Sequence, residues 1–406
     1  MKGSEGIPQL KLETLNKVIN AFPKAPNLHF SKMFGTNKAE SDTIKWEIEY
    51  GSAGMTPFVA PGSVAPAIGL DGVGEGSAVA AFFKEKMYFD EEYLNNLRKL
   101  GTYASFEAAK VKLARGLRKL KNRMDRRREW MFSQALINGA FSYVTKGETN
   151  VSVSYGMPTT HIVTLATDDK WLAGTTRNPV RDIMDAQTVL SNDAGVRASK
   201  AYLNSELVKL LVLDTNIQAL LAKSAFGNGD LFTRPVQVLG SLLNIDLTVY
   251  DELYEVQGWL MTAVAAGSST TFTVDDPSDF EVGGIIRFTK MSEFNTWEDE
   301  TISAVNKTTG VITVSSAPTL GFSVGDKVTM RKKFIDDTTF FMMSPTAADG
   351  MPIAELLEAP YGLSRRYGYY ADKHDEWDPE GTWLRNQDKC LPVIFHPDTT
   401  YKLIVG

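Results

Sequence analysis

The sequence predicts an α+β protein with a small all-β domain inserted into its second half. Three observations lead to this fold class. A strand pattern of period two lies at residues 43–50, and one long helix pattern without proline follows at 104–140. A stretch at 262–332 is rich in Thr, Val, Ser and Gly, and turn signals interrupt it every few residues. We therefore expect long strands, a dominant helix and a separate group of short strands.

Composition bounds the class of protein. The chain has 406 residues, enough for two or three domains, and is 43% hydrophobic and 23% charged, as soluble globular proteins are. It holds no apolar run long enough to cross a bilayer, and its first residues lack the apolar core of a signal peptide. Cys390 is the single cysteine, which fits a reducing cytoplasm. The net charge of −6 gives no overall reason for nucleic-acid affinity.

The first strands frame an unusual segment. Ile44, Trp46 and Ile48 alternate with polar residues, and residues 78–89 return as a second strand. Between them, residues 51–76 are too apolar for a solvated linker and too rich in Gly and Pro for a helix or a central strand. These features predict one very long hairpin with an apolar tip.

Helix patterns dominate the middle of the chain. A short amphipathic helix is predicted at 10–22, after which the arm is extended, and the helix at 104–140 would be about 55 Å long, a spine for the fold. The elements predicted next are a hairpin of 150–155 with 161–165, a helix from Pro179, a strand at 200–204, a helix at 205–213 capped by Ser205, and a helix at 216–223.

Strands are predicted again from residue 235. The runs PVQVLGS (235–241) and NIDLTVYDELYE (244–255) continue naturally into TTFFMMS at 338–344. The stretch at 262–332 lies between them and predicts a small β-barrel or sandwich. We interpret it as a domain that replaced the turn of a hairpin, where insertions are best tolerated.

No chemical site emerges from the sequence. The four histidines are scattered, and neither a nucleophile elbow nor a phosphate loop is present. Cys390 enters an apolar strand and is expected to be buried. The acidic run DKHDEWD at 372–378 offers metal ligands or an acid/base pair, but a solvated loop is the favoured interpretation. We predict no catalytic, cofactor-binding or metal-binding residues.

The spine helix carries the one notable charge pattern. Ten basic residues lie between Lys110 and Arg128, and Asp125 is the only acid among them. This pattern indicates either a surface for nucleic acid or an acidic partner, or a solvated face matched by acids elsewhere. The overall acidity favours the second interpretation. Arg126, Arg127 and Arg128 are the candidates for DNA or partner contact.

The order of these parts resembles the major capsid proteins of tailed bacteriophages, which have the Hong Kong 97-type fold. It is most similar to the phage lambda major capsid protein E family. The resemblance covers most of the chain outside 262–332. The residues that carry it are TPFVAPG (56–62), REWMFSQALINGAF (128–141), NVSVSYGMP (150–158) with Trp171, NPVRDI (178–183) and LTVYDELYE (247–255).

The resemblance implies a division of the chain. The parts are an N-terminal arm (1–42), an E-loop hairpin (43–90), a P-domain (91–176) with the spine helix 104–140 and a β-hairpin, a first A-domain part (177–261), the inserted β-domain (262–332), a second A-domain part (333–360) and a C-terminal segment returning to the core (361–406).

The implied function is that of a head protein without enzymatic activity or cofactors. Copies would assemble into hexamers and pentamers of an icosahedral shell around double-stranded DNA, bound non-specifically. The implied partners are a portal protein, a scaffolding protein and a decoration protein, with no membrane. The protein would belong to the virion and assemble in the host cytoplasm. An encapsulin-like compartment shell is the first alternative, and a metal-dependent hydrolase using DKHDEWD is the second.

The hairpin tip is the implied contact between subunits. An extended arm can lay apolar side chains on a neighbour and pair its backbone there. The tip residues concerned are Met55, Pro57, Phe58, Val59, Val64, Ile68 and Leu70. Some capsids of this fold join a lysine of this loop covalently to a neighbour. Because no lysine lies between Lys45 and Lys84, we expect this contact to be non-covalent.

Overall fold

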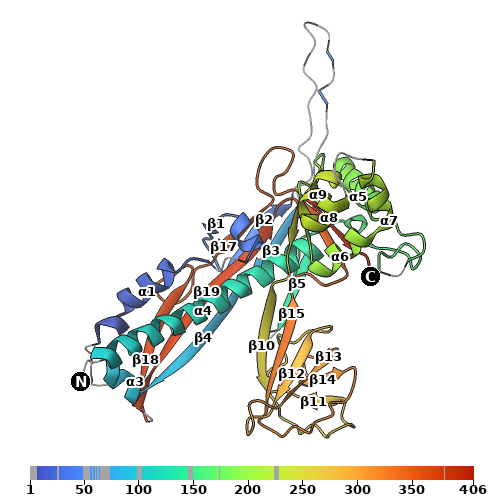
Figure 1. The fold of residues 1–406 in the computed structure, drawn as a ribbon. Helices are drawn as coiled ribbons and strands as arrows, with labels where there is room; N and C mark the ends of the chain where they lie inside the picture. The colour runs from blue at the N-terminus through green and yellow to red at the C-terminus, as the bar shows by residue number, and fades with distance from the viewer. Residues whose placement is uncertain are drawn as a thin grey trace. The chain divides into compact units, whose positions relative to one another are not determined.

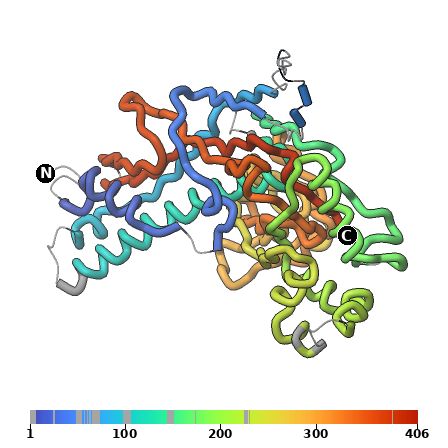
Figure 2. The backbone as a smooth tube through the Cα atoms, turned by 90° about the horizontal axis from the view of Figure 1, so that it is seen from above, coloured from blue at the N-terminus to red at the C-terminus, as the bar shows by residue number. Residues whose placement is uncertain are grey.

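The computed structural model describes residues 7–24, 27–48, 55–56, 58–59, 61, 64, 74–97, 103–144, 150–172, 174–223, 228–378 and 380–406. The chain divides into two compact units (Figures 1 and 2). Unit 1 combines residues 1–136 with 345–397, and unit 2 combines 137–344 with 398–406. Each unit therefore contains segments that are far apart in the sequence.

Unit 1 is built from helices packed on a long sheet. Its elements are η1 (Pro8–Leu10), α1 (Leu12–Ala21), α2 (Phe30–Met33), β1 (Thr36–Lys38), β2 (Thr43–Ile48), β3 (Gly74–Val79), β4 (Ala81–Asp90), α3 (Glu91–Leu97), most of α4 (Tyr103–Asn138), β17 (Ala354–Glu358), β18 (Tyr370–Trp377) and β19 (Glu380–Ile394). The spine helix is α4, as predicted. The arm after α1 is not extended throughout, because residues 30–33 form the short helix α2 before the strand β1.

The long strand β19 organises the sheet of unit 1. The strand order is β1-β17-β19-β18, and β4 pairs with β19 along ten residues, from Ala81 opposite Cys390 to Asp90 opposite Gly381. Helices α1, α3 and α4 run along this sheet (Figure 1). They share a core with it that includes Leu15, Ile19, Tyr93, Leu113, Leu117, Ala371 and Leu384. The apolar spacing of α4 thus reflects its packing on β4, β18 and β19.

The predicted hairpin begins as expected. Strands β2 and β3 pair antiparallel, with Thr43 opposite Val79 and Ile48 opposite Gly74. Along β2 the buried side chains are Ile44, Trp46 and Ile48, in strict alternation. The second strand is broken at Ala80, and β4 leaves β3 to join β19. The hairpin is therefore anchored in the sheet of unit 1.

Unit 2 contains a mixed sheet, a two-stranded hairpin and a barrel. Its elements are β5 (Ala140–Val144), β6 (Asn150–Ser154), η2 (Thr159–His161), β7 (Ile162–Thr164), α5 (Pro179–Asp193), β8 (Lys200–Leu203), α6 (Ser205–Leu213), α7 (Thr215–Leu221), α8 (Asn228–Thr233), α9 (Pro235–Leu243), β9 (Asp246–Val249), β10 (Leu253–Trp259), β11 (Thr271–Thr273), β12 (Ile285–Thr289), β13 (Trp297–Asn306), β14 (Val311–Val314), β15 (Lys327–Lys333), β16 (Thr339–Met343) and β20 (Thr400–Ile404). The turn η3 (Pro397–Thr399) precedes β20.

The mixed sheet has the order β7-β20-β16-β8-β9. Helices α5, α6, α7 and α9 pack on it around a core that includes Trp171, Leu190, Leu207, Leu239, Phe340 and Leu403. Residues 235–241, predicted as a strand, begin helix α9. Pro235 suits the first helical turn, and Val238, Leu239 and Leu243 form one buried face.

Three further local predictions were wrong. Strand β6 pairs with β5, and β7 pairs with β20, so 150–155 and 161–165 do not form a hairpin. The cap of α6 is Asn204, whose side chain accepts a hydrogen bond from the Leu207 N–H, and not Ser205. The acidic run at 372–378 is not a loop, because it lies largely within strand β18.

The inserted strands form a small closed barrel. The order is β10-β15-β12-β13-β14-β11, and the bridge from Leu260 to Val274 joins the first strand to the last. Inside it, Phe272 meets Phe288 edge to face, and Phe288 stacks on Phe322. The barrel includes β10 and β15, so it extends beyond 262–332 on both sides. Its outermost pair is Leu253 with Lys333, which places the entry and exit of the chain side by side.

Candidate functional site

The tip of the long hairpin bears exposed apolar side chains. Met55 is 90% exposed and Phe58 is 105% exposed, while Val59 and Val64 are also exposed. The other predicted tip residues, Pro57, Ile68 and Leu70, lie outside the described residues. Large apolar side chains exposed to water at this level are candidates for contact with a partner.

A cleft of about 660 Å³ lies at the foot of this hairpin, within unit 1. Trp46, Met351 and Phe395 contribute apolar surface to it. Acidic side chains also line it, namely Glu47 and Glu75 of the hairpin, with Asp349 and Glu355. Lys45 and His396 line it as well, so the cleft that the base of the hairpin helps to form is mainly acidic and partly apolar.

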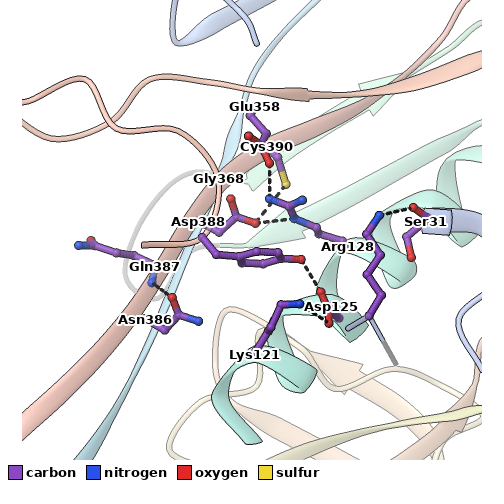
Figure 3. Close-up of polar contacts among 12 residues, drawn as sticks. Ser31, Lys121, Asp125, Arg128, Glu358, Gly368, Asn386, Gln387, Asp388 and Cys390 are labelled. Carbon is purple, nitrogen blue, oxygen red and sulfur yellow. Dashed lines mark hydrogen bonds and ion pairs between the residues drawn. The ribbon is translucent and has the colours of Figure 1, made fainter. Parts of the chain in front are cut away.

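The basic run of α4 ends in a buried ion-pair cluster (Figure 3). The guanidinium of Arg128 donates from Nε to Asp388 Oδ2 at 2.7 Å and from Nη2 to Glu358 Oε1 at 2.8 Å. Its Cζ atom lies 4.0 Å from the ring centroid of Tyr369. Burial alone would lower the pKa of Arg128, but Asp388 and its other neighbours outweigh burial and raise it. The residue is a fixed cation that joins α4 to β17 and β19.

The cluster continues along α4 through Asp125. Tyr369 donates its hydroxyl to Asp125 Oδ1 at 2.5 Å, and Lys121 Nζ lies 3.9 Å from Asp125 Oδ2. The same ammonium donates to the Phe22 carbonyl at 2.6 Å. Burial raises the pKa of Tyr369 far above its ordinary value, so the phenol remains a donor. These contacts fix the end of α1 on the spine helix.

Glu129 joins α4 to the short helix α2 of the arm. Its carboxylate accepts from the backbone N–H groups of His29 (2.9 Å), Phe30 (2.9 Å) and Ser31 (2.7 Å). Free N–H groups at the start of a helix favour an acceptor of negative charge. Glu129 thus holds the short helix of the arm against α4.

These positions correct part of the prediction for the three arginines. Arg128 is 3% exposed and paired, so it lies out of reach of DNA or another subunit. Arg126 and Arg127 are half-buried, and the Arg127 guanidinium lies 5.4 Å from the Trp130 ring centroid. Their role in DNA or partner contact stays a prediction. The sequence analysis did not predict the partners Asp388 and Glu358. Asp388 directly precedes the apolar run KCLPVIF (389–395), and an acid at the edge of a predicted buried strand indicates a buried ion pair.

Acidic side chains within residues 372–378 form hydrogen bonds with side chains of the neighbouring strand β19. Asp372 faces Arg385 across the β18–β19 pair and accepts two hydrogen bonds from it, at 2.9 and 2.6 Å. Asp375 accepts from Thr382, and Glu376 accepts from the indole of Trp383. Within the described part of the chain, no three His, Cys, Asp or Glu side chains are grouped to hold a metal ion. No described helix is long and apolar enough to span a membrane.

Comparison with known proteins identifies the family. The family model "Phage major capsid protein E" matches residues 11–288, more than half of the chain. The chain belongs to the phage major capsid protein E family. It is therefore a capsid protein, as its sequence motifs predicted. No curated protein sequence matches it.

Solved structures show the same fold. A crystal structure of the putative capsid protein of a prophage from Escherichia coli CFT073 has a TM-score of 0.55 at 13% identity, covering 98% of this chain and 99% of that one. A phage-related protein from Bordetella bronchiseptica RB50 has a TM-score of 0.50 at 8% identity, covering 97% of each chain. The likeness extends over the whole capsid protein, which confirms the predicted capsid fold.

Proposed function

We propose that this capsid protein is the head-shell subunit of a tailed phage, and that its long hairpin contacts the neighbouring subunit. Copies would form hexamers and pentamers of an icosahedral shell around double-stranded DNA. The family match supports a capsid role, and the exposed apolar tip of the hairpin is the observation that carries the contact. A head-to-tail contact of this kind closes into rings.

The proposal includes the subunit's wider role. The protein would have no catalytic activity, would belong to the virion and would assemble in the host cytoplasm. A portal protein, a scaffolding protein and a decoration protein would be its protein partners. Arg126 and Arg127 would contribute to non-specific contact with DNA or a partner, because their side chains, unlike that of Arg128, are partly exposed to solvent.

Shortening the hairpin tests the subunit contact. Ile48 and Gly74 are paired, so residues 49–73 can be replaced by Asn-Gly, a sequence suited to a two-residue hairpin turn. We expect the circular dichroism spectrum of the subunit to be retained while particles disappear from sedimentation profiles. Normal shells from this variant would refute the contact.

Point variants at the tip refine the test. Phe58→Ala should weaken assembly more than Thr56→Ala, because only the phenylalanine offers a large apolar side chain. Denaturing gels of mature particles should show single chains, since the tip has no lysine to join to a neighbour. A covalent ladder that maps to this tip would contradict the non-covalent contact.

A further inference from the structure

An exposed tryptophan stands at the turn between β18 and β19. Trp377 is paired with Glu380 at the end of this hairpin, and its side chain is 90% exposed. Asp378 and Glu380 are exposed beside it, while Glu376 is engaged by Trp383. Tryptophan is enriched among residues that dominate binding energy at interfaces. This end of the hairpin therefore carries two exposed acids and one large exposed apolar side chain.

A basic cleft lies at the same end of unit 1, between β4 and α4. Its volume is about 290 Å³, and Met87, Phe89 and Tyr93 provide an apolar and aromatic lining. Lys112, Arg115 and Lys119 of α4 also line it, with Asp90 as the acid. In the part of the chain that the structure describes, Arg115 and Lys119 have no carboxylate within ion-pair distance.

The turn and the cleft are complementary in charge and chemistry. A tryptophan side chain buries roughly 150–250 Å² when it is enclosed, and the cleft has the apolar lining to enclose one. Two exposed acids accompany the tryptophan, and two unpaired bases flank the cleft. Charge complementarity of this kind selects the partner and fixes the register of a contact.

The pairing of β4 with β19 places the Trp377 turn and the basic cleft next to each other on one chain. Asp90 is paired with Gly381 and Phe89 with Thr382, so the cleft begins next to the turn. Trp377 nevertheless stays exposed, so it does not fill the cleft of its own chain. If the turn of one copy binds the cleft of the next, the two copies use different surfaces. Such a head-to-tail contact can close into a ring around a rotation axis.

We propose that the Trp377 turn of one copy inserts into the β4–α4 cleft of a second copy, with Asp378 and Glu380 facing Arg115 and Lys119. The inference rests on the proposed shell assembly and adds a second contact between subunits. It is separate from the hairpin tip, because β2 and β3 form a two-stranded sheet of their own, whereas the turn joins β18 to β19 and the cleft lies between β4 and α4.

Assembly of the full chain tests the tryptophan. Trp377→Ala should raise the concentration needed for half of the protein to sediment as particles by at least about tenfold, a difference typical of losing an interface anchor. Leu363→Ala is the matched control, because Leu363 is also fully exposed, and it should assemble like the wild type. Circular dichroism should show that both variants are folded.

Charge exchange tests the pairing. Asp378→Arg with Glu380→Arg should impair assembly, as should Arg115→Glu with Lys119→Glu. Combining all four substitutions should restore it. Reversal of two exposed lysines of unit 2, Lys209→Glu with Lys223→Glu, should leave assembly unchanged.

The outcomes separate the inference from the proposed function. If the wild-type chain forms no particles, shell assembly itself fails. If the wild type forms particles and the Trp377 and charge variants do so equally well, only the turn-in-cleft contact is overturned. Loss of packaged DNA with normal assembly in the Arg115 and Lys119 variant would assign the cleft to nucleic acid and also overturn it.

Discussion

Arg128 shows how a single residue can take a role that its local sequence hides. It follows two other arginines on a helix rich in bases, so its neighbours suggest a solvated or DNA-facing side chain. Its partners Asp388 and Glu358 lie 260 and 230 residues away in the sequence. Only the packing of α4 on β17 and β19 brings them together. No spacing rule within the helix could have predicted this.

Removing the buried arginine should destabilise the subunit. Arg128→Gln leaves Asp388 and Glu358 without their cation, and breaking a buried pair in this way costs about 3–5 kcal/mol of unfolding free energy. Arg126→Gln, on the same helix but half-buried, should cost less than about 1 kcal/mol. Urea unfolding of the unassembled subunit measures both. Equal small effects would show that the buried cluster does not contribute to stability.

Asp182 should make stability depend on pH. Burial raises its pKa above the ordinary value, although the indole N–H of Trp171 donates to it at 2.8 Å and partly opposes this. In the window between the unfolded pKa and the raised folded pKa, the folded state holds more protons. The contribution of Asp182 to the free energy of unfolding is therefore present at low pH and is lost as pH rises through the folded pKa.

The variant Asp182→Asn removes that dependence and keeps an oxygen to accept from Trp171. Its Tm relative to the wild type should increase from about pH 4 to about pH 7. Asp185→Asn, on the exposed side of the same helix, should show a much smaller trend. If the Tm difference between Asp182→Asn and the wild type did not change across this range, a raised pKa of Asp182 would be contradicted.

At the scale of elements, patterns with a clear period were predicted well. The alternation of β2, the length of α4 and the proline-initiated start of α5 all agree with the sequence analysis. Helix α9 was mistaken for a strand, because its valines and leucine favour either structure in a short apolar run. Strand β18 was mistaken for a loop, since its charged residues are stabilised by partners on β19 that the local sequence does not contain.

The β2–β3 hairpin offers a matched pair of glycines. A Cβ at Gly76 would collide with the indole of Trp46 on the paired strand, whereas one at Gly74 would lie 3.5 Å from the Ile48 Cβ. Gly76→Ala should therefore cost about 1–3 kcal/mol through overpacking. Gly74→Ala should be neutral or slightly stabilising. Unfolding curves followed by tryptophan fluorescence compare them, and similar stabilities would exclude a close approach at Gly76.

At the scale of the whole molecule, the barrel is the part most separable from the rest. It has its own aromatic core, and the chain enters and leaves it at the adjacent residues Leu253 and Lys333. Residues 251–335 expressed alone should fold and give a dispersed amide NMR spectrum. The full chain with 254–332 replaced by a short turn should keep a cooperative unfolding transition. A collapsed spectrum from the isolated barrel would refute its autonomy.

The central claim is that this chain builds a shell. Electron microscopy of the purified full-length protein, alone and together with any scaffolding protein encoded beside it, tests this most directly. The account predicts closed icosahedral particles made of hexamers and pentamers. Monomers or small oligomers under every assembly condition, with and without the scaffold, would contradict it.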